Sequence, residues 1–246
     1  MILYGIHPVE EALLAGRRKI IKIYVSSRKS SRILKIVDRA ESSRIPVEYL
    51  SADKLCSLAG TGSHQGVGAQ IEGFPFSDPG RIMATDGSGL VLVLDGLMDP
   101  HNVGALIRTA LCVGVTGIIL PKDRSVSITS AVSMASAGAL EHIRLARVTN
   151  ISGTLMQLKS AGFWVAGLVP LADQSIFETD LSGPLALVVG SEEKGIRPLV
   201  KKKCDFLLSI PQQGKVDSLN VSVAGAVALY EIFRQRQAMT AKTGHR

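Results

Sequence analysis

The sequence predicts an α/β protein in which helices cover both faces of a parallel sheet. Three observations support this prediction. Continuous apolar segments such as LVLVLD at 90–95 and LALVVG at 185–190 are typical of strands that are buried on both faces. Segments with helical spacing separate these strands along the chain. Hydrophobic residues make up 46% of the sequence and aromatic residues only 4%, so the core must consist mainly of aliphatic side chains.

The first seventy residues predict a small α/β unit. Apolar residues recur with helical spacing in some segments and alternate as in strands in others. In chain order the expected elements are a helix at 7–15, a strand at 20–26, a helix at 30–43, a strand at 46–50, a short helix and the segment HQGVGAQIE at 64–72.

The composition changes after this unit. Two prolines and four glycines lie between residues 73 and 89, which is typical of a connection between domains. We therefore predict a first domain at 1–72, a linker at 73–88 and a second domain at 89–246.

The second domain alternates buried strands with helices, which predicts a parallel sheet. The expected strands are at 90–95, 117–121, 142–148, 163–169, 185–190 and 205–211, and the expected helices are at 102–114, 128–140, 151–162 and from about 218 to 236.

The charge balance favours a polyanionic partner. The chain has 28 basic and 21 acidic residues, a net charge of +7, and residues 1–50 hold ten Lys and Arg against five Asp and Glu. Lys and Arg contacts to phosphate supply most of the sequence-independent affinity for nucleic acid. A merely soluble basic protein is the alternative, and the uneven distribution favours RNA.

Other features argue against several protein classes. Cys56, Cys112 and Cys204 form no C-x-x-C pair, so neither a zinc site nor a disulfide framework is expected, and the expected location is the cytoplasm. The five histidines show no i, i+4 pairing, so no metal is expected. No signal-peptide pattern is present, and no apolar stretch is long enough to span a membrane.

Three predicted strand ends carry unusual polar residues, and ligands collect at such ends in open parallel sheets. In the first segment, DPHNVGALIRTA, Asp99 and Pro100 predict a turn, and Asn102 is placed to cap the following helix. Arg108 then stands in an otherwise apolar helix. By itself this segment fits a capped helix whose arginine reaches solvent.

The second segment, GSEEKG at 190–195, is a glycine-punctuated turn between a strand and a helix. It is neither a P-loop nor a G-x-G-x-x-G fingerprint, so Glu192 is either an acidic anchor or a solvated loop charge. The third segment places Ser218 and Asn220 at a helix start, where Ser218 fits a cap. The small residues that follow allow close backbone packing, either in the core or across a dimer.

In this order and spacing, the three segments resemble the signature motifs of the SpoU (TrmH-type) RNA 2′-O-methyltransferases of the SPOUT class. DPHNVGALIRTA and SLNVSVA are the most specific matches, and the resemblance covers 89–236. YGIHPVEEAL and HQGVGAQI further resemble the RNA substrate-binding domain of the branch that methylates guanosine in 23S ribosomal RNA. Glu193 stands where the family's second motif has a glycine, so we expect either a strained turn or a different one.

The resemblance implies a SPOUT-type parallel sheet with a deep C-terminal trefoil knot, preceded by a small L30e-like α/β domain that binds the RNA substrate. It also implies a homodimer. The cofactor would be S-adenosylmethionine, held in the knot largely by backbone groups. By matching motifs, the cofactor-binding positions are Gly190, Ile210 and Leu219, with Gly167 and Leu168 nearby.

The resemblance further implies methyl transfer to a ribose 2′-hydroxyl, with Arg108 matching the arginine to which activation of that hydroxyl is assigned. Because the pKa of arginine exceeds ~12, we expect its charge to stabilise the developing alkoxide and to hold the adjacent phosphate. Asn102, Glu192, Ser218 and Asn220 would position Arg108 and the ribose. The proton acceptor is left open.

The expected partner is RNA, with 23S ribosomal RNA as the favoured substrate. In the first domain, Arg17, Arg18, Lys19, His64 and Gln65 are the candidate RNA contacts. Three alternatives stay open: transfer RNA as the substrate, a non-catalytic RNA-binding module, and a nicotinamide-dependent enzyme, which the missing dinucleotide fingerprint disfavours.

Overall fold

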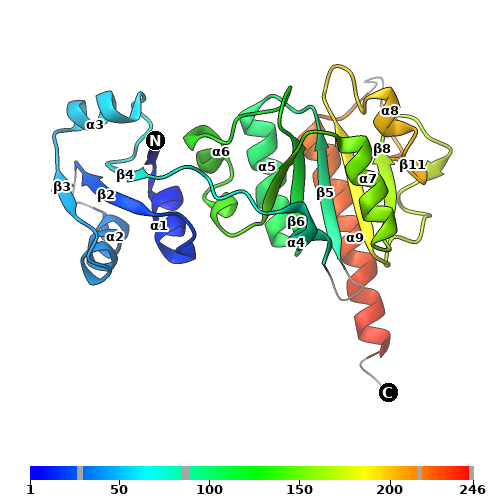
Figure 1. The fold of residues 1–246 in the computed structure, drawn as a ribbon, viewed down its shortest axis with the longest axis horizontal. Coiled ribbons are helices and arrows are strands. Elements are labelled where there is room, and N and C mark those ends of the chain that lie inside the picture. The colour runs from blue at the N-terminus through cyan, green and yellow to red at the C-terminus, as the bar shows by residue number, and fades with distance from the viewer. Residues whose placement is uncertain (27–29, 85–88, 215–217, 244–246) are drawn as a thin grey trace. The chain divides into compact units, whose positions relative to one another are not determined.

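The computed structural model describes residues 1–26, 30–84, 89–214 and 218–243, without the side chains of 240–243. The chain forms two compact units (Figure 1). The first consists of residues 1–75 and 128–142, and the second of 76–127 and 143–246. Residues 85–88 of the expected linker and the last three residues of the expected second domain lie outside the described residues.

The first unit contains a four-stranded sheet in the order β1-β4-β2-β3. Strand β4 is antiparallel to β1 and β2, while β2 and β3 are parallel. The elements are β1 (Ile2–Tyr4), α1 (Ile6–Ala15), β2 (Ile20–Val25), α2 (Ser31–Ser42), β3 (Val47–Tyr49), α3 (Ala52–Ala59) and β4 (Val67–Ile71).

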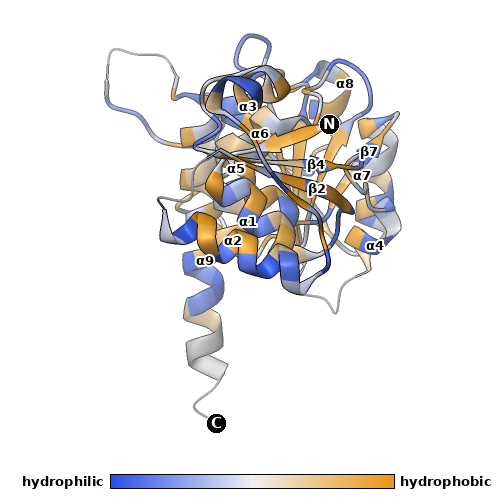
Figure 2. Cartoon of the chain, turned by 90° about the vertical axis from the view of Figure 1, so that its left-hand side faces the viewer, coloured by the Kyte–Doolittle hydropathy of each residue, from blue (hydrophilic) through white to orange (hydrophobic). Residues whose placement is uncertain are grey.

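Amphipathic helices account for the core of this unit. Both α1 and α2 carry apolar as well as polar residues (Figure 2). In α2 the buried residues are Ile33, Ile36, Val37 and Ala40, a spacing that places them on one face of the helix. They belong to one cluster with Leu3 and other apolar side chains of the sheet. The helix predicted at 30–43 is confirmed.

Residues 128–142 belong to the first unit although they lie between two strands of the second unit in sequence. They form α6 (Ser130–Ala135) and the 3-10 helix η1 (Ala139–Glu141) instead of the single helix predicted at 128–140. Ala137 has φ 51° and Gly138 has φ 85°, so the backbone leaves the helical conformation there. A Cβ on Gly138 would lie 2.6 Å from Glu11 Cγ, so only glycine allows this approach.

A buried ion pair fixes this segment within the unit. Arg18 Nε lies 2.8 Å from Glu141 Oε2, and each side chain is 1% exposed. Ser133 Oγ donates to Glu141 Oε1 at 3.0 Å, and the Arg18 guanidinium lies 4.5 Å from the ring centroid of Phe74. Burial raises the pKa of the Glu141 carboxyl, and the charge of Arg18 opposes this rise. The structure does not support the predicted contact of Arg18 with RNA, because this side chain is buried and its charge is paired inside the fold.

The second unit contains a seven-stranded sheet in the order β7-β6-β5-β10-β8-β11-β9, and all neighbouring strands are parallel. This confirms the predicted parallel sheet. The strands are β5 (Leu90–Asp95), β6 (Gly117–Pro121), β7 (Leu145–Val148), β8 (Trp164–Leu168), β9 (Gln174–Ser175), β10 (Leu185–Gly190) and β11 (Phe206–Ser209).

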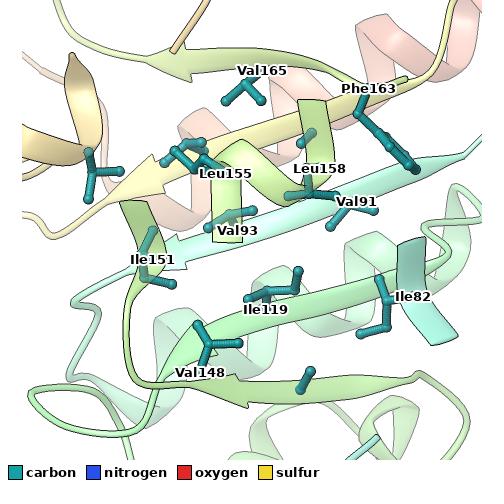
Figure 3. Close-up of a cluster of buried hydrophobic side chains, with 14 of the residues drawn as sticks. Ile82, Val91, Val93, Ile119, Val148, Ile151, Leu155, Leu158, Phe163 and Val165 are labelled. Atoms are coloured by element: carbon teal, nitrogen blue, oxygen red, sulfur yellow. The ribbon is translucent and has the colours of Figure 1, made fainter. Parts of the chain in front are cut away.

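Helices pack on this sheet through aliphatic side chains. On one face, Val91 and Val93 of β5 meet Ile151, Leu155 and Leu158 of α7 (Figure 3). The helices of the unit are α4 (Pro79–Met83), α5 (Pro100–Cys112), α7 (Ile151–Ser160), α8 (Pro198–Lys201) and α9 (Val221–Thr243). None of the described helices is both long enough and apolar enough to cross a membrane.

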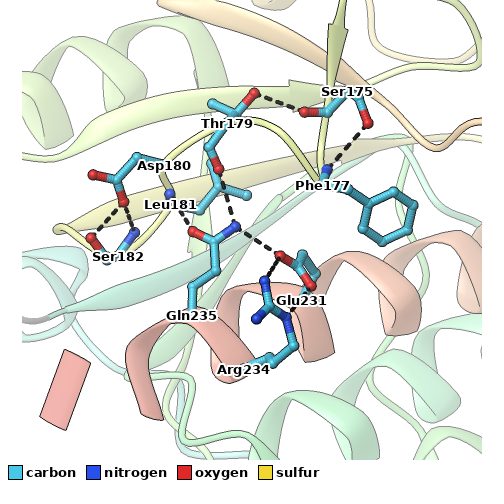
Figure 4. Close-up of polar contacts among 9 residues, drawn as sticks. All are labelled: Ser175, Phe177, Thr179, Asp180, Leu181, Ser182, Glu231, Arg234 and Gln235. Carbon is cyan, nitrogen blue, oxygen red and sulfur yellow. Dashed lines mark hydrogen bonds and ion pairs between the residues drawn. The ribbon is translucent and has the colours of Figure 1, made fainter. Parts of the chain in front are cut away.

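The final helix, α9, is fixed by close packing and by polar contacts. A Cβ on Gly225 would lie 2.4 Å from Leu106 Cδ2 of α5, so the small residue permits the two helices to approach. Farther along, Gln235 accepts from the Leu181 backbone at 2.8 Å and donates to the Thr179 carbonyl at 3.1 Å (Figure 4). The Gly225 contact holds the start of α9 against α5, and the Gln235 contacts hold its second half.

The Glu141→Ala substitution should lower the free energy of unfolding of the first unit by about 3–5 kcal/mol, because it leaves the Arg18 charge buried without a partner. Urea denaturation followed by circular dichroism measures the effect. The double variant Arg18→Met/Glu141→Leu should recover most of the loss. Lys19→Ala is the matched control, because it removes an ion pair whose side chains are 73% and 54% exposed, which should cost less than about 1 kcal/mol.

Candidate functional site

Three segments that are distant in sequence meet at the carboxyl end of the second unit's sheet. Asn102 Nδ2 donates to Glu192 Oε1, and Asn220 Nδ2 donates to both Asn102 Oδ1 and Glu192 Oε1 at 3.1 Å. Strands β5 and β10 are neighbours, with Gly190 opposite Asp95, so the segments that follow them emerge side by side. The structure thus brings together one predicted residue from each of the three motifs.

The helix caps orient two members of this cluster. Asp99, and not Asn102, caps α5: its carboxylate accepts from the backbone of His101 at 3.2 Å and of Asn102 at 3.0 Å. The Asn102 amide is thereby free to bond Glu192. At the start of α9, Asn220 Oδ1 accepts from the Ser222 backbone at 2.9 Å, so Asn220 caps this helix instead of Ser218.

The turn after β10 is tight because Gly190 approaches the backbone of Gly195. A Cβ on Gly190 would lie 2.1 Å from the Gly195 carbonyl carbon. The turn closes through two backbone hydrogen bonds between Ser191 and Gly195, of 2.8 and 3.1 Å. The positive φ falls on Gly195, at 61°, and Glu193 does not adopt one. The chain therefore accommodates Glu193 without a positive φ and without backbone strain at that residue.

The turn, β8 and the start of α9 enclose a first cavity of about 480 Å³. Seven of the predicted site residues line it: Leu168, Gly190, Glu192, Ile210, Ser218, Leu219 and Asn220. Gln212 and Lys194 also line it and were not predicted, although Gln212 follows directly on the Ile210 motif. Gly167 does not line the cavity. A Cβ there would lie 2.8 Å from Leu207 Cδ2 and 3.0 Å from Cys204 Sγ, so Gly167 serves packing.

A buried carboxylate that the sequence analysis did not identify also stabilises the turn after β10. Asp95, at the end of β5, is 1% exposed, and its oxygens accept from the Arg197 backbone at 2.9 Å and from Arg197 Nε at 2.8 Å. The signal was present in the sequence, because a carboxylate that ends a continuous apolar strand needs a charged or hydrogen-bonding partner when buried.

Asp95 and Arg197 line a second cavity, also of about 480 Å³, together with Asn102 and Glu192.

Arg108 lies away from the polar cluster. Its side chain is exposed on α5, and it lines neither cavity. Within the described residues it has no hydrogen bond or ion pair. The structure of one chain therefore does not bring Arg108 together with Asn102, Glu192, Ser218 and Asn220.

Most of the other predicted RNA contacts are already hydrogen-bonded within the protein. His64 is 8% exposed, and its Nδ1 accepts from the Gly66 backbone at 3.0 Å, so it stabilises a loop. Gln65 is exposed but accepts from the Ile6 backbone at 2.9 Å. Arg17 donates to the Glu141 carbonyl at 3.4 Å. Lys19 forms an ion pair with Glu72 at 3.0 Å, and its side chain is 73% exposed.

The lining of the first cavity is suited to binding and orienting a ligand. Its wall consists of backbone, apolar side chains and the amide–carboxylate cluster. In the described part of the chain, no group of three His, Cys, Asp or Glu residues could hold a metal ion. Burial raises the pKa of the nearby Cys204 thiol to about 11, so this thiol is protonated at neutral pH and is a poor nucleophile.

Two protein-family models match the chain. The SpoU rRNA Methylase family matches residues 89–230, and the family of RNA 2′-O ribose methyltransferase substrate-binding domains matches residues 2–77. Among curated relatives is the 23S rRNA (guanosine-2′-O-)-methyltransferase RlmB of Coxiella burnetii. It is 41% identical over 241 residues, and the alignment covers 96% of each chain. A protein of Staphylococcus saprophyticus named as a TrmH family tRNA/rRNA methyltransferase shows the same identity and coverage.

Solved structures agree with the sequence relatives. The SpoU methyltransferase AviRb of Streptomyces viridochromogenes, in complex with AdoMet, superposes with a TM-score of 0.83 at 23% identity over 97% of this chain and 91% of AviRb. This likeness shows the fold. A TrmH-family protein of Porphyromonas gingivalis, named as an RNA methyltransferase, superposes with a TM-score of 0.78 at 28% identity over 95% and 89% of the two chains.

Gly190→Ala should displace the turn at 191–195 and lower the free energy of unfolding by about 1–3 kcal/mol, because the added methyl group overlaps backbone atoms. Thermal unfolding of the purified variant measures this. Gly183→Ala is the matched control: a Cβ there meets nothing within 4 Å, so its stability should stay within about 0.5 kcal/mol of the parent. Equal stability of the two variants would contradict the close approach at Gly190.

Proposed function

This chain belongs to the SpoU rRNA methylase family, as an RNA 2′-O-methyltransferase that takes its methyl group from S-adenosylmethionine, and we propose that its substrate is a guanosine of 23S ribosomal RNA. The observation that carries methyl transfer to a ribose hydroxyl is the cluster of Asn102, Glu192 and Asn220 at the edge of the first cavity. The likeness to the Coxiella burnetii enzyme supports the choice of RNA.

In this proposal the first cavity holds the cofactor. The residues fit such a ligand: Leu168, Ile210 and Leu219 provide apolar walls, and Gly190 and Gly195 can line the cavity only with backbone atoms. The volume of about 480 Å³ lies in the range of small-molecule sites. S-adenosylmethionine supplies an already activated methyl group, so the protein has to bind, orient and exclude water.

The polar cluster then positions the ribose. Amide and carboxylate groups held at helix and strand ends can hydrogen-bond a hydroxyl in one orientation. Arg108 contributes a fixed positive charge that stabilises the developing alkoxide, since its guanidinium is not readily deprotonated. The residue that accepts the hydroxyl proton is not assigned.

We further propose that the protein acts as a homodimer. Arg108 is exposed and lines neither cavity of its own chain, so a second copy is the simplest source of this charge at the site. Val223 and Tyr230 of α9 are 48% and 54% exposed, and an interface would cover such apolar surface. The trefoil knot, RNA binding by the L30e-like first domain and the cytoplasmic location complete the proposal, and they rest on the family resemblance.

Transfer RNA is the second candidate substrate, because the relative from Staphylococcus saprophyticus is named for both tRNA and rRNA. Separate methylation assays with a 23S transcript and with bulk transfer RNA decide between them. Methyl incorporation into transfer RNA alone would overturn the ribosomal assignment. No calorimetric heat with S-adenosylmethionine at millimolar concentration would favour a non-catalytic RNA-binding module instead.

Arg108→Ala should reduce methyl transfer by about 100-fold or more, because a charge aimed at the transition state is lost. The affinity for S-adenosylmethionine, measured by calorimetry, should stay nearly unchanged. Arg81→Ala removes another exposed arginine of the same unit and serves as the control. Equal loss of turnover and cofactor affinity in Arg108→Ala would contradict its assigned role.

Mixing Arg108→Ala with Asn220→Ala tests the dimer. If Arg108 acts across the interface, each mixed dimer contains one site with both residues intact, so activity should return after the two inactive proteins exchange subunits. No recovery, although exchange of labelled subunits is demonstrated, would place Arg108 in the site of its own chain.

A further inference from the structure

The second cavity shares a wall with the first. Residues 191–194 and Val221 line both, and each cavity has a volume of about 480 Å³. The second cavity also contains Asn102 and the residues that follow β5. A group transfer needs two adjoining sites, one for the donor and one for the acceptor. We assign the methyl donor to the first cavity. The second cavity adjoins it, as a site for the methyl acceptor must.

Three cations from separate segments line the second cavity. Arg124 lies in the loop after β6, Lys194 lies in the turn after β10, and Arg197 directly precedes α8. Arg197 is held rigidly, since buried Asp95 binds its backbone and its side chain, yet this side chain remains 45% exposed. Arg124 and Lys194 are exposed and form no side-chain ion pair among the described residues.

Three of the four carboxylates that line this cavity already have hydrogen-bond or ion-pair partners within the protein. Asp95 pairs with Arg197, Asp99 accepts from two backbone amides of α5, and Glu192 accepts from two asparagine amides. Glu193 is the remaining acidic residue in the lining, and it also lines the first cavity. In this lining Arg124 and Lys194 are cations without an internal partner in the part of the chain that the structure describes, so two positive side chains are available to an anionic ligand.

The backbone at Arg124 supports a specific role for this residue. Its φ is 54°, a left-handed conformation that is uncommon outside glycine and asparagine. The neighbouring Val126 amide donates to the Leu97 carbonyl at 2.9 Å, which joins this loop to the segment after β5. Strain of this kind persists where the surrounding structure holds a residue at a functional position.

We propose that the second cavity is the acceptor-nucleotide site, in which Arg124, Lys194 and Arg197 bind the backbone phosphates next to the target ribose. The inference rests on the proposed methyl transfer and adds residues to it. Arginine and lysine side chains are the usual phosphate ligands of RNA-binding proteins, and a pre-positioned arginine loses little freedom on binding. Asn102 and Glu192 at the shared wall then present the ribose to the donor cavity.

The Arg124→Asn variant tests this inference, because asparagine tolerates positive φ and the substitution removes only the cation. With methylation of the RNA substrate as the readout, KM for RNA should rise about 10-fold, since a charge-assisted hydrogen bond is lost. The value of kcat at saturating RNA and the affinity for S-adenosylmethionine should remain close to the parent. The slope of log KM against log salt concentration should fall by about one unit. Lys202→Ala, which changes a residue that lines neither cavity, is the charge-matched control.

Equal KM values and salt slopes for Arg124→Asn and Lys202→Ala would overturn the inference. A loss of cofactor affinity in Arg124→Asn would also overturn it, because the residue would then belong to the donor site. Filter binding of the same RNA to the same variants, with S-adenosylhomocysteine present, reports on the cavity without turnover. If the parent protein methylated no RNA but Arg124→Asn still weakened RNA binding relative to the control, the proposed reaction would fail and the binding site would stand.

Discussion

The site depends on hydrogen bonds among Asn102, Glu192 and Asn220, which join positions up to 118 residues apart. Such bonds between accessible side chains contribute only about 0.5–1.5 kcal/mol each. They cannot by themselves hold three segments together. The parallel register of β5 and β10 and the caps of α5 and α9 fix the backbone first. The cluster is therefore a consequence of the sheet, and its geometry is as rigid as the element ends that carry it.

The turn after β10 connects this geometry to two cavities. Gly190 allows backbone to approach backbone on one side, while buried Asp95 holds Arg197 on the other. The turn cannot move without breaking one of these contacts. A fixed partition between donor and acceptor is what a reaction with an activated methyl group requires, since correct orientation supplies much of the acceleration.

Local patterns in the sequence were sufficient to predict the parallel sheet, most of its strands and the three motifs that converge. They failed where tertiary contacts decide the outcome. The helix expected to reach residue 140 ends at Ala135, because Ala137 and Gly138 take left-handed backbone conformations where the chain passes close to Glu11. Asp99 replaces Asn102 as the cap of α5, a choice between neighbouring polar residues that spacing alone does not make. The family resemblance implies Arg108 at the site, but within one chain a helical residue six positions after Asn102 faces elsewhere, so motif order alone does not tell which copy of the chain supplies it.

The number of basic residues in the sequence is a poor guide to the charge available to RNA, because it does not distinguish cations that are paired inside the protein from cations that are free. In the first unit Arg18 is buried against Glu141, while Lys19 and Lys22 pair with Glu72 and Glu48. The basic excess of residues 1–50 therefore overstates the charge available to a phosphate backbone. Arg124 and Lys194 form no side-chain ion pair among the described residues and line the cavity beside the cluster. Phosphate contacts of this kind hold the RNA equally in the ground state and in the transition state, so they set the affinity for RNA and leave the rate at saturation to the groups that meet the reacting ribose.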